Sequence, residues 1–332
     1  MTQTLARTPS AKAPPAVGLV LVALGVVYLV WGSTYLGIRI VVEEAPPLVS
    51  GGMRFFTAGV LLAVLLSVRG GVRRLRVTRR ELAGASFLGL MLPMLGNGLV
   101  SVGEDLGAPS GVTALLIAVV PLWIVVFRAV GGDRPRPLSL FGVVLGFAGL
   151  GYLVLAGEAS GASELTLLAA GIIVFASTCW SIGSYAQPKL ELPKDVFVTT
   201  VYEMLAGGTI MVLTGLAVGE RFTFDYPVRT WLALGYLVVF GSMVAYTSYV
   251  WLLAHAPISL VATYAYVNPV VAVFLGWLVL SEPVTSPVVV GGGVVVLAVA
   301  IVITAERPRR KPLPETPVPE TVPPEVVSSR NG

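Results

Sequence analysis

The chain has 332 residues, of which 55% are hydrophobic and only 12% charged, whereas soluble globular proteins carry about 25% charged residues. This balance excludes an ordinary soluble enzyme and indicates a chain that lies mostly in lipid. The single cysteine, Cys179, excludes an internal disulfide, and the single histidine, His255, leaves too few ligands for a Cys/His zinc site. We therefore expect no metal site, no cofactor and no catalytic residue.

Ten apolar stretches of about 20 residues, the length that crosses a hydrocarbon core of about 30 Å, follow one another along the chain. Backbone groups in lipid have to bond within their own segment, so each stretch is predicted to be a helix. The first apolar run is longer than the roughly 7–15 residues of a signal-peptide core, which indicates a retained helix. The predicted spans are 17–41, 48–68, 82–102, 109–130, 138–156, 165–187, 196–218, 230–252, 258–280 and 285–304.

Basic residues gather on one side of this arrangement, which carries 18 of the 22 lysines and arginines. Because Lys and Arg favour cytoplasmic loops, both termini are predicted to be cytoplasmic in a multi-pass protein of the inner (cytoplasmic) membrane. The loop 69–80 alone contains six arginines. A nucleic-acid patch is the other interpretation of this loop, but the topology rule explains it better, so we expect the lipid bilayer and no nucleic acid as a partner.

The two halves of the chain align at a constant offset of 148 or 149 residues, which indicates an internal duplication. Each half has five spans, an odd number, so the second half enters the membrane in the opposite sense to the first. The predicted fold class is an all-α integral membrane protein of ten transmembrane helices in two inverted five-helix repeats. The pairs in register are Trp31 with Trp180, Arg54 with Glu203, Gly142 with Gly291, Pro109 with Pro257 and Pro121 with Pro269.

We expect four segments along the chain. Residues 1–16 form a cytoplasmic N-terminal segment, and residues 17–156 and 165–304 form the first and second five-helix repeats. Residues 305–332, rich in proline and glutamate, are predicted to be a disordered cytoplasmic tail. Inverted repeats of this kind place a binding site near the membrane midplane and suit alternating access.

Several short motifs resemble those of the EamA family of the drug/metabolite transporter superfamily, and the resemblance covers residues 17–304. It implies a ten-helix carrier built from two EamA-like repeats, with YddG-like amino-acid exporters as the nearest subtype. The chain departs from the pattern after its fourth span, where Gly131-Gly132-Asp133 stands in place of a counterpart to Glu282. The motifs are 31–39 (WGSTYLGIR), Pro46-Pro47, 52–55 (GMRF), Tyr264, Asn268-Pro269 and Ser281-Glu282-Pro283.

Aromatic and hydroxyl side chains recur at helical spacing in several spans, a pattern that suits a cavity gripping a partly polar solute. The alternative is that the aromatic rings fill space between helices and that the asparagines bond from helix to helix. The candidate substrate-binding residues are Trp31, Tyr35, Asn97, Trp180, Ser184, Tyr246, Tyr249, Tyr264 and Asn268.

Charged residues inside spans are costly, on the order of 3 kcal/mol each on insertion scales, and are expected to face protein or water. Arg54, Glu203 and Arg39 are therefore candidates for coupling or for anchoring a charge. Glu203 is either a proton site or a structural partner of hydroxyls such as those of Thr199 and Thr200, and Arg54 either anchors an anion or holds carbonyls. About 12 Å of membrane depth separates Arg54 from Glu203, so no direct ion pair is expected.

Prolines and glycines mark two further features of the spans. Pro121 and Pro269 occupy equivalent positions at mid-depth, either as hinges that free backbone carbonyls near the cavity or as static kinks. Glycines in the fifth and tenth spans are predicted to pack the two repeats together away from the site. They are Gly142, Gly146, Gly149, Gly291, Gly292 and Gly293.

These features favour a secondary active transporter that exports small organic metabolites, amino acids or related compounds and drugs, by alternating access. Export, as the direction of transport, is implied by the family resemblance alone. Protons are the candidate coupling ion, and the oligomeric state is open. A passive facilitator, uniporter or importer is the alternative within this class. Three other classes are disfavoured by what the sequence lacks. It has no phosphate-binding loop of an ATP-driven pump, no G-x-S-x-G motif of an intramembrane enzyme, and no repeated filter rings of a channel.

Overall fold

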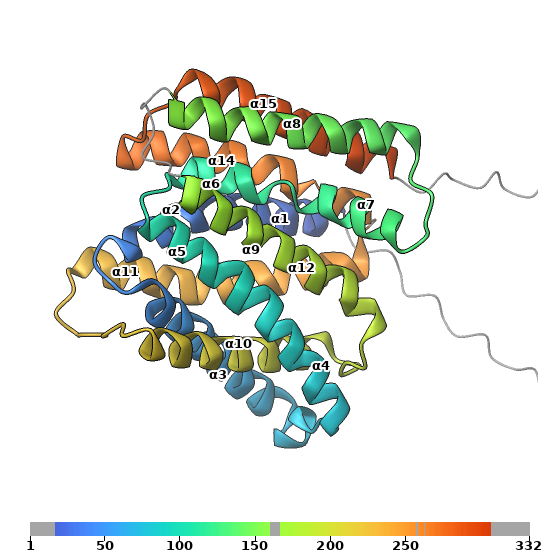
Figure 1. The fold of residues 1–332 in the computed structure, drawn as a ribbon. Coiled ribbons are helices and arrows are strands. Elements are labelled where there is room, and N and C mark those ends of the chain that lie inside the picture. The colour runs from blue at the N-terminus through green and yellow to red at the C-terminus, as the bar shows by residue number, and fades with distance from the viewer. Residues whose placement is uncertain (1–16, 160–166, 257, 262, 307–332) are drawn as a thin grey trace, which may run out of the picture.

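The computed structural model describes residues 17–159, 167–256, 258–261 and 263–306, and within them every regular element is a helix (Figure 1). The predicted N-terminal segment 1–16, most of the tail 305–332 and Pro257 lie outside the described residues.

The first repeat comprises five spans, three of which are assembled from shorter helices. The first is α1 (Val17–Val26), the π-helix η1 (Val27–Trp31) and α2 (Gly32–Val42), and the second is α3 (Pro47–Gly70), followed by the short η2 (Val72–Leu75). The third is α4 (Arg79–Gly89), the π-helix η3 (Leu90–Gly98) and α5 (Leu99–Asp105). The fourth is α6 (Ser110–Ile117) with α7 (Val120–Val130), and the fifth is α8 (Pro137–Ala159).

The second repeat follows the same plan. The sixth span is α9 (Leu167–Ala186), with the short η4 (Gln187–Lys189), and the seventh is α10 (Val196–Ala217). The eighth is α11 (Val228–Tyr236), the π-helix η5 (Leu237–Val244) and α12 (Ala245–His255). The ninth is α13 (Ile258–Val261) with α14 (Tyr264–Leu280), and the tenth is α15 (Ser286–Ala305).

The predicted spans are present as helices. Nine helical segments of the described chain are long and apolar enough to cross a membrane, and the tenth, in the ninth span, is the shorter α14. Ten crossings return Glu306 to the face from which Val17 starts. We call this the basic face, because it carries Arg69 to Arg80, Arg134, Arg136, Lys189 and Lys194. The other is the acidic face, which carries Glu43, Glu44, Asp105, Glu220, Asp225 and Glu282.

Two pairs of equivalent spans share the same irregularities, whereas the π-helix η1 of the first span has no counterpart in α9 of the sixth. The π-helices η3 and η5 lie in the third and eighth spans, at a similar offset to the other repeat pairs. The fourth span breaks after Ile117 and the ninth after Val261. Pro121 stands in the first turn of α7, where its missing N–H costs no helical bond, and Pro269 lies within a continuous α14. The fourth span is therefore interrupted directly before Pro121, as predicted, whereas the prediction that Pro269 interrupts its helix is wrong. The hinge role of the two residues stays a prediction.

Two pairs of repeat-related helices pack side by side and join the repeats. The helix α3 lies along α10, and α8 lies along α15 (Figure 1). In the second pair Gly142 and Gly149 of α8 face Val302 and Val294 of α15, and Gly291 faces the backbone of Leu153. The predicted role in close packing between the repeats is confirmed for Gly142, Gly149 and Gly291, and it is wrong for Gly293, where a Cβ would meet nothing within 4 Å.

Carboxylates of the second repeat bond to helix N-termini of the first at the acidic face. Glu220 accepts hydrogen bonds from the backbone N–H groups of Leu48 (3.2 Å) and Val49 (2.7 Å) in the first turn of α3. Glu282 accepts from Ser110 N (2.8 Å), Ser110 Oγ (3.0 Å) and Gly111 N (3.2 Å) at the start of α6. Each carboxylate satisfies N–H groups that have no partner within their helix and lies at the positive end of its dipole.

A different set of contacts ties the repeats together at the basic face. Arg128, near the end of α7, bonds to Asp133 (2.9 Å) and to Glu306 (2.6 Å), and Ser139 of α8 also donates to Glu306. Partial burial opposes ionisation of Glu306, but the hydrogen bonds from Ser139 and Arg128 outweigh it and lower the pKa of this carboxyl. The two faces therefore differ in their polar chemistry.

The glycine run of α15 offers a matched test of the packing between repeats. A Cβ at Gly291 would lie 2.9–3.0 Å from Leu153 backbone and Cβ atoms, whereas a Cβ at Gly293 would meet nothing within 4 Å. We expect Gly291→Ala to lower the thermal unfolding midpoint of the purified protein by several degrees, because overpacking costs about 1–3 kcal/mol. Gly293→Ala, the control, should leave the midpoint unchanged or raise it. Equal midpoints for the two variants would contradict this packing.

Candidate functional site

A central cavity of about 110 Å³ lies between the two repeats. One water needs about 10–15 Å³ of such space, so the cavity admits several waters or part of a small solute. It is bordered by the first four spans and by the sixth to the ninth. Its lining residues are Trp31, Thr34, Tyr35, Ile38, Arg54, Phe55, Leu92, Pro93, Gly96, Asn97, Val100, Ala114, Ile117, Ala118, Val120, Trp180, Glu203, Met204, Gly241, Ser242, Tyr246, Tyr264, Ala265, Asn268 and Pro269.

Most of the residues predicted to bind substrate lie on this cavity. They are Trp31, Tyr35, Asn97, Trp180, Tyr246, Tyr264 and Asn268, and the charged candidates Arg54 and Glu203 and the proline Pro269 join them.

Four predicted residues do not line the cavity. Ser184 bonds to the backbone carbonyl of Trp180, because a serine inside a helix can satisfy its hydroxyl on the preceding turn. Tyr249 stands behind Trp31, with 4.9 Å between the ring centroids. Arg39 lies beyond the cavity at the acidic face, and Pro121 lies outside the lining.

Aromatic rings border the cavity on the side of the basic face. The Trp31 ring packs against Tyr264 (5.3 Å between centroids) and Tyr246 (6.1 Å) as well as Tyr249. Tyr249 also contacts Tyr264, at 5.7 Å. Edge-to-face packing of this kind adds about 0.5–1.5 kcal/mol per pair beyond the burial of area. The four rings form one contiguous wall, which we call the aromatic cluster.

Trp180, the second tryptophan of the cavity lining, reaches the cavity because Gly96 leaves room for its ring. A Cβ at Gly96 of η3 would lie 2.7 Å from Cε3 of Trp180. On another wall, Asn268 Oδ1 is buried and has no hydrogen-bond partner within the described part of the chain. A buried acceptor without a donor costs free energy, so Asn268 is ready to accept a hydrogen bond from a solute or a water.

Arg54 brings a positive charge to the cavity. It is 5% exposed on α3, and its Nε donates to Ser242 Oγ of η5 at 3.0 Å. Its guanidinium carbon lies 4.7 Å from the centroid of the Phe55 ring. The hydrogen-bond partner of Arg54 is thus a hydroxyl, and not the backbone carbonyls that were one of the two alternatives from the sequence. A guanidinium has five N–H donors, and this one faces a cavity, which suits an anionic group of a solute.

Glu203 brings a negative charge to the same cavity from α10. It is 3% exposed, and it accepts a hydrogen bond from the Tyr246 hydroxyl at 2.9 Å. The structural partners expected from the sequence are wrong, because Thr199 bonds to the carbonyl of Pro193 and Thr200 to that of Val196. Tyr246 comes from the eighth span, so local spacing could not reveal it.

The two charges are not paired with each other in the described structure, as the depth estimate predicts. Arg54 bonds to Ser242 and Glu203 to Tyr246. A cation and an anion therefore border one cavity without neutralising each other. This arrangement can hold a solute that carries both signs of charge.

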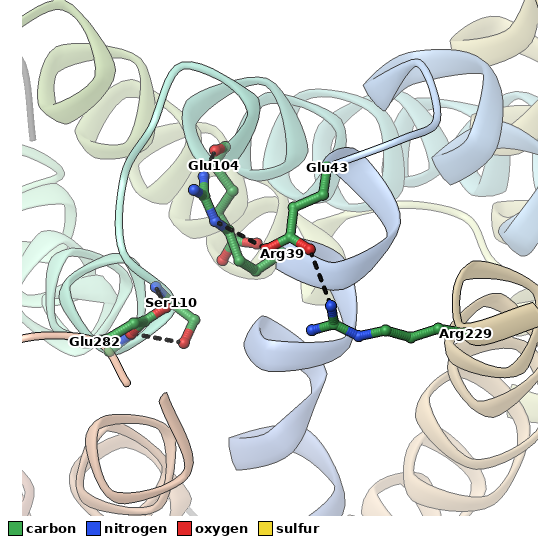
Figure 2. Close-up of polar contacts among 7 residues, drawn as sticks. Arg39, Glu43, Glu104, Ser110, Arg229 and Glu282 are labelled. Carbon is green, nitrogen blue, oxygen red and sulfur yellow. Dashed lines mark hydrogen bonds and ion pairs between the residues drawn. The ribbon is translucent and has the colours of Figure 1, made fainter. Parts of the chain in front are cut away.

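An ionic cluster covers the acidic face beyond the cavity (Figure 2). Arg39 Nη1 of α2 donates to the backbone carbonyl of Glu104, and Arg39 Nε lies 4.0 Å from Glu43. Glu43 also lies 3.5 Å from Arg229 of α11. These contacts connect the first, third and eighth spans, so the cavity has an ionic cluster on one side and an aromatic cluster on the other.

Comparison with known proteins identifies the architecture. The model of the EamA-like transporter family matches residues 16–155 and again residues 167–304. The chain belongs to the EamA-like transporter family. It is 38% identical over 280 residues to the uncharacterized inner membrane transporter YedA of Escherichia coli K12, covering 84% of this chain and 89% of YedA.

More distant relatives share the same extent. The uncharacterized transporter YoaV of Bacillus subtilis is 21% identical over 277 residues, which cover 82% of this chain and 93% of YoaV. A solved crystal structure at 20% identity superposes with a TM-score of 0.60 and covers 88% of this chain and 100% of that chain. This EamA-like protein is therefore a multi-pass membrane transporter of the drug/metabolite superfamily, with two repeats.

Sequence analysis missed several residues of the site in this EamA-like transporter. Thr34 and Ile38 lie on the helix face already chosen for Trp31, so helical spacing could have found them. Pro93 and Gly96 lie in the π-helix η3, which no sequence pattern predicted. The contacts of Glu104 and Glu282 could not be predicted, because their partners are distant in sequence.

The contact between Tyr246 and Glu203 can be measured by a double-mutant cycle. We expect Tyr246→Phe to destabilise the transporter by about 1–3 kcal/mol, because it leaves a buried carboxylate without its donor. The same change in a Glu203→Met background should cost far less, since no acceptor remains. Thermal unfolding of the four proteins gives the coupling free energy. Additive effects of the two substitutions would contradict a direct contact.

Proposed function

We propose that this EamA-like transporter exports small amphipathic organic solutes, amino acids or related compounds, by alternating access. The observation that carries this proposal is that Arg54 and Glu203, which form no ion pair with each other, border one cavity that two tryptophans also line. A carboxylate of the solute would bind Arg54, its ammonium would bind Glu203 and the faces of aromatic rings, and Asn268 would accept a hydrogen bond.

The proposed cycle uses the two clusters as the closures of the cavity. Opening between the helices at the aromatic cluster would admit solute from the basic face, and opening at the ionic cluster would release it at the acidic face. The positive-inside rule places the basic face in the cytoplasm, so this direction is export from the cell across the inner membrane. Inverted repeats supply two such states related by symmetry.

The orientation is tested by reporters at the C-terminus. A C-terminal green fluorescent protein should fluoresce, and alkaline phosphatase fused at the same position should be inactive, because ten crossings from a cytoplasmic start end in the cytoplasm. As a control, phosphatase inserted in the loop that contains Asp225, on the acidic face, should be active. Phosphatase activity at the C-terminus would overturn the orientation and with it the assignment of export.

The transport class is tested by counterflow of amino acids and related compounds in proteoliposomes, with and without a pH gradient. A carrier should exchange labelled for unlabelled solute and saturate. A flux that rises without limit would indicate a passive pore, and exchange that ignores the pH gradient would indicate a uniporter. Uptake with inverted sidedness would indicate an importer.

Glu203 is the proposed proton-coupling residue within the cavity. Glu203→Gln should abolish transport driven by a pH gradient, because the amide cannot bind and lose a proton, and it should raise the solute concentration that gives half-maximal counterflow, because the ammonium loses its charged partner. Glu44→Gln, which alters an exposed carboxylate of the acidic face, is the matched control and should change neither. Gradient-driven transport that survives in Glu203→Gln would count against coupling at this residue.

A further inference from the structure

A second carboxyl group, Glu104, is buried outside the lining of the cavity. It lies in the last turn of α5, one helical turn beyond the cavity-lining Val100, and it is 0% exposed. Neither of its carboxylate oxygens has a hydrogen-bond partner within the described part of the chain. Glu104 thus lies between the cavity and the acidic face, inside the protein (Figure 2).

The polar groups around Glu104 leave its carboxyl unpaired. Thr113 of α6, also fully buried, lies beside the Glu104 carboxyl, but its hydroxyl forms no hydrogen bond of standard geometry among the described residues. Arg39 of α2 is the nearby cation, and its Nη1 donates to the backbone carbonyl of Glu104. The nearby acidic group is Glu282, which bonds to the start of α6. Tyr35 of α2, which lines the cavity, also interacts electrostatically with Glu104.

The other elements packed against α5 add no charge that could neutralise Glu104. The helix α9 and the π-helix η3 contain no charged residue. The cation of α3 nearest to mid-membrane, Arg54, bonds to Ser242. The adjacent Asp105 is itself acidic. An ionised Glu104 would therefore be buried beside another carboxylate, and beside one cation, Arg39, which bonds to the backbone carbonyl of Glu104 and lies near Glu43.

Energetics favour a neutral carboxyl in this state. Removing an ionised carboxylate from water without hydrogen-bond donors costs several kcal/mol, whereas a protonated carboxyl costs much less. The burial of Glu104 therefore requires a proton on it while the acidic face is closed. When α5 and α6 separate and water enters, ionisation of Glu104 becomes favourable.

We propose that Glu104 is a proton-binding residue whose protonation permits the acidic face to close. The carboxyl takes up a proton from the water at that face, closure buries the neutral acid against Thr113, and reopening returns the group to water. Low pH thus favours closure of this face and high pH favours its opening. This inference rests on the proposed alternating access, and it adds a proton site on the far side of the cavity from Glu203.

Infrared difference spectroscopy of the purified protein in liposomes tests the protonation directly. At about pH 7, the spectrum of wild type minus Glu104→Gln should contain the C=O stretch of a protonated carboxyl, because exposed glutamates are ionised at this pH. Glu43→Gln, a carboxylate of the ionic cluster that is partly exposed, is the matched control and should show no such difference. A wild-type spectrum identical to that of Glu104→Gln throughout a titration would overturn the proposal.

Hydrogen exchange tests the link to closure. The peptides that cover residues 99–117 should exchange faster in wild type at about pH 8 than at about pH 6, after correction for the intrinsic rate, since opening increases exchange. Glu104→Gln should exchange slowly at both values, and Glu44→Gln, which alters an exposed carboxylate outside the ionic cluster, should behave like wild type. The wild-type pH response in Glu104→Gln would contradict the proposal.

Folding of Glu104→Gln distinguishes a protonated Glu104 from a structural charge at this position. A neutral amide replaces a neutral acid of the same length, so Glu104→Gln should fold with an unfolding midpoint within a few degrees of wild type. If Glu104→Gln fails to fold while Glu104→Asp folds, the charge is structural and the proposal is wrong. These measurements need no transported solute. A protein with the infrared band but no solute exchange contradicts only the proposed function, and one with exchange but no band contradicts only this inference.

Discussion

In the hydrocarbon core of a membrane no water is available to a charged or polar side chain, so its hydrogen bonds have to come from the protein. This constraint explains why Arg54 bonds to Ser242 and why Glu203 bonds to Tyr246, each across helices that are distant in sequence. It also explains why the exceptions carry information. Asn268 and Glu104 are buried polar groups without a partner in the described structure, and they lie at the cavity and beside it.

The same constraint shapes the contacts between the repeats. Helices gain no hydrophobic driving force from meeting in lipid, so they associate through close packing and polar contacts. The pair α8 and α15 uses glycines, which permit backbones to approach. The N-termini of α3 and α6 use carboxylates from the other repeat, since their first N–H groups have no helical partner. Packing at mid-membrane and capping at the acidic face thus join the same two bundles by different means.

Much of this fold could be predicted because lipid simplifies the pattern: a span needs only length and hydropathy, and a duplication needs only a constant offset. Trp31 and Trp180 were found at the cavity because helical spacing places them on inward faces. Ser184 shares the helix face of Trp180 and Tyr249 that of Tyr246, yet neither lines the cavity. The Ser184 hydroxyl bonds to the backbone, and the Tyr249 ring packs against Trp31. Residues whose roles depend on a distant partner, such as Glu282 with Ser110, could not be inferred, because the sequence does not say which helices touch.

The contacts at the two faces show where the repeats depart from symmetry. Glu282 follows the ninth span and bonds to the start of α6, whereas Asp133, which follows the fourth span, bonds to Arg128 of its own helix. An inverted repeat with perfect symmetry would open and close both faces by the same contacts. Here the acidic face is held by carboxylates and an ionic cluster, and aromatic rings border the cavity on the side of the basic face. One of these rings, Tyr246, bonds to the carboxyl of Glu203, and Arg128 and Ser139 bond to Glu306 at the basic face. Protons can therefore act on contacts on both sides of the cavity, through carboxyl groups whose partners differ from one side to the other.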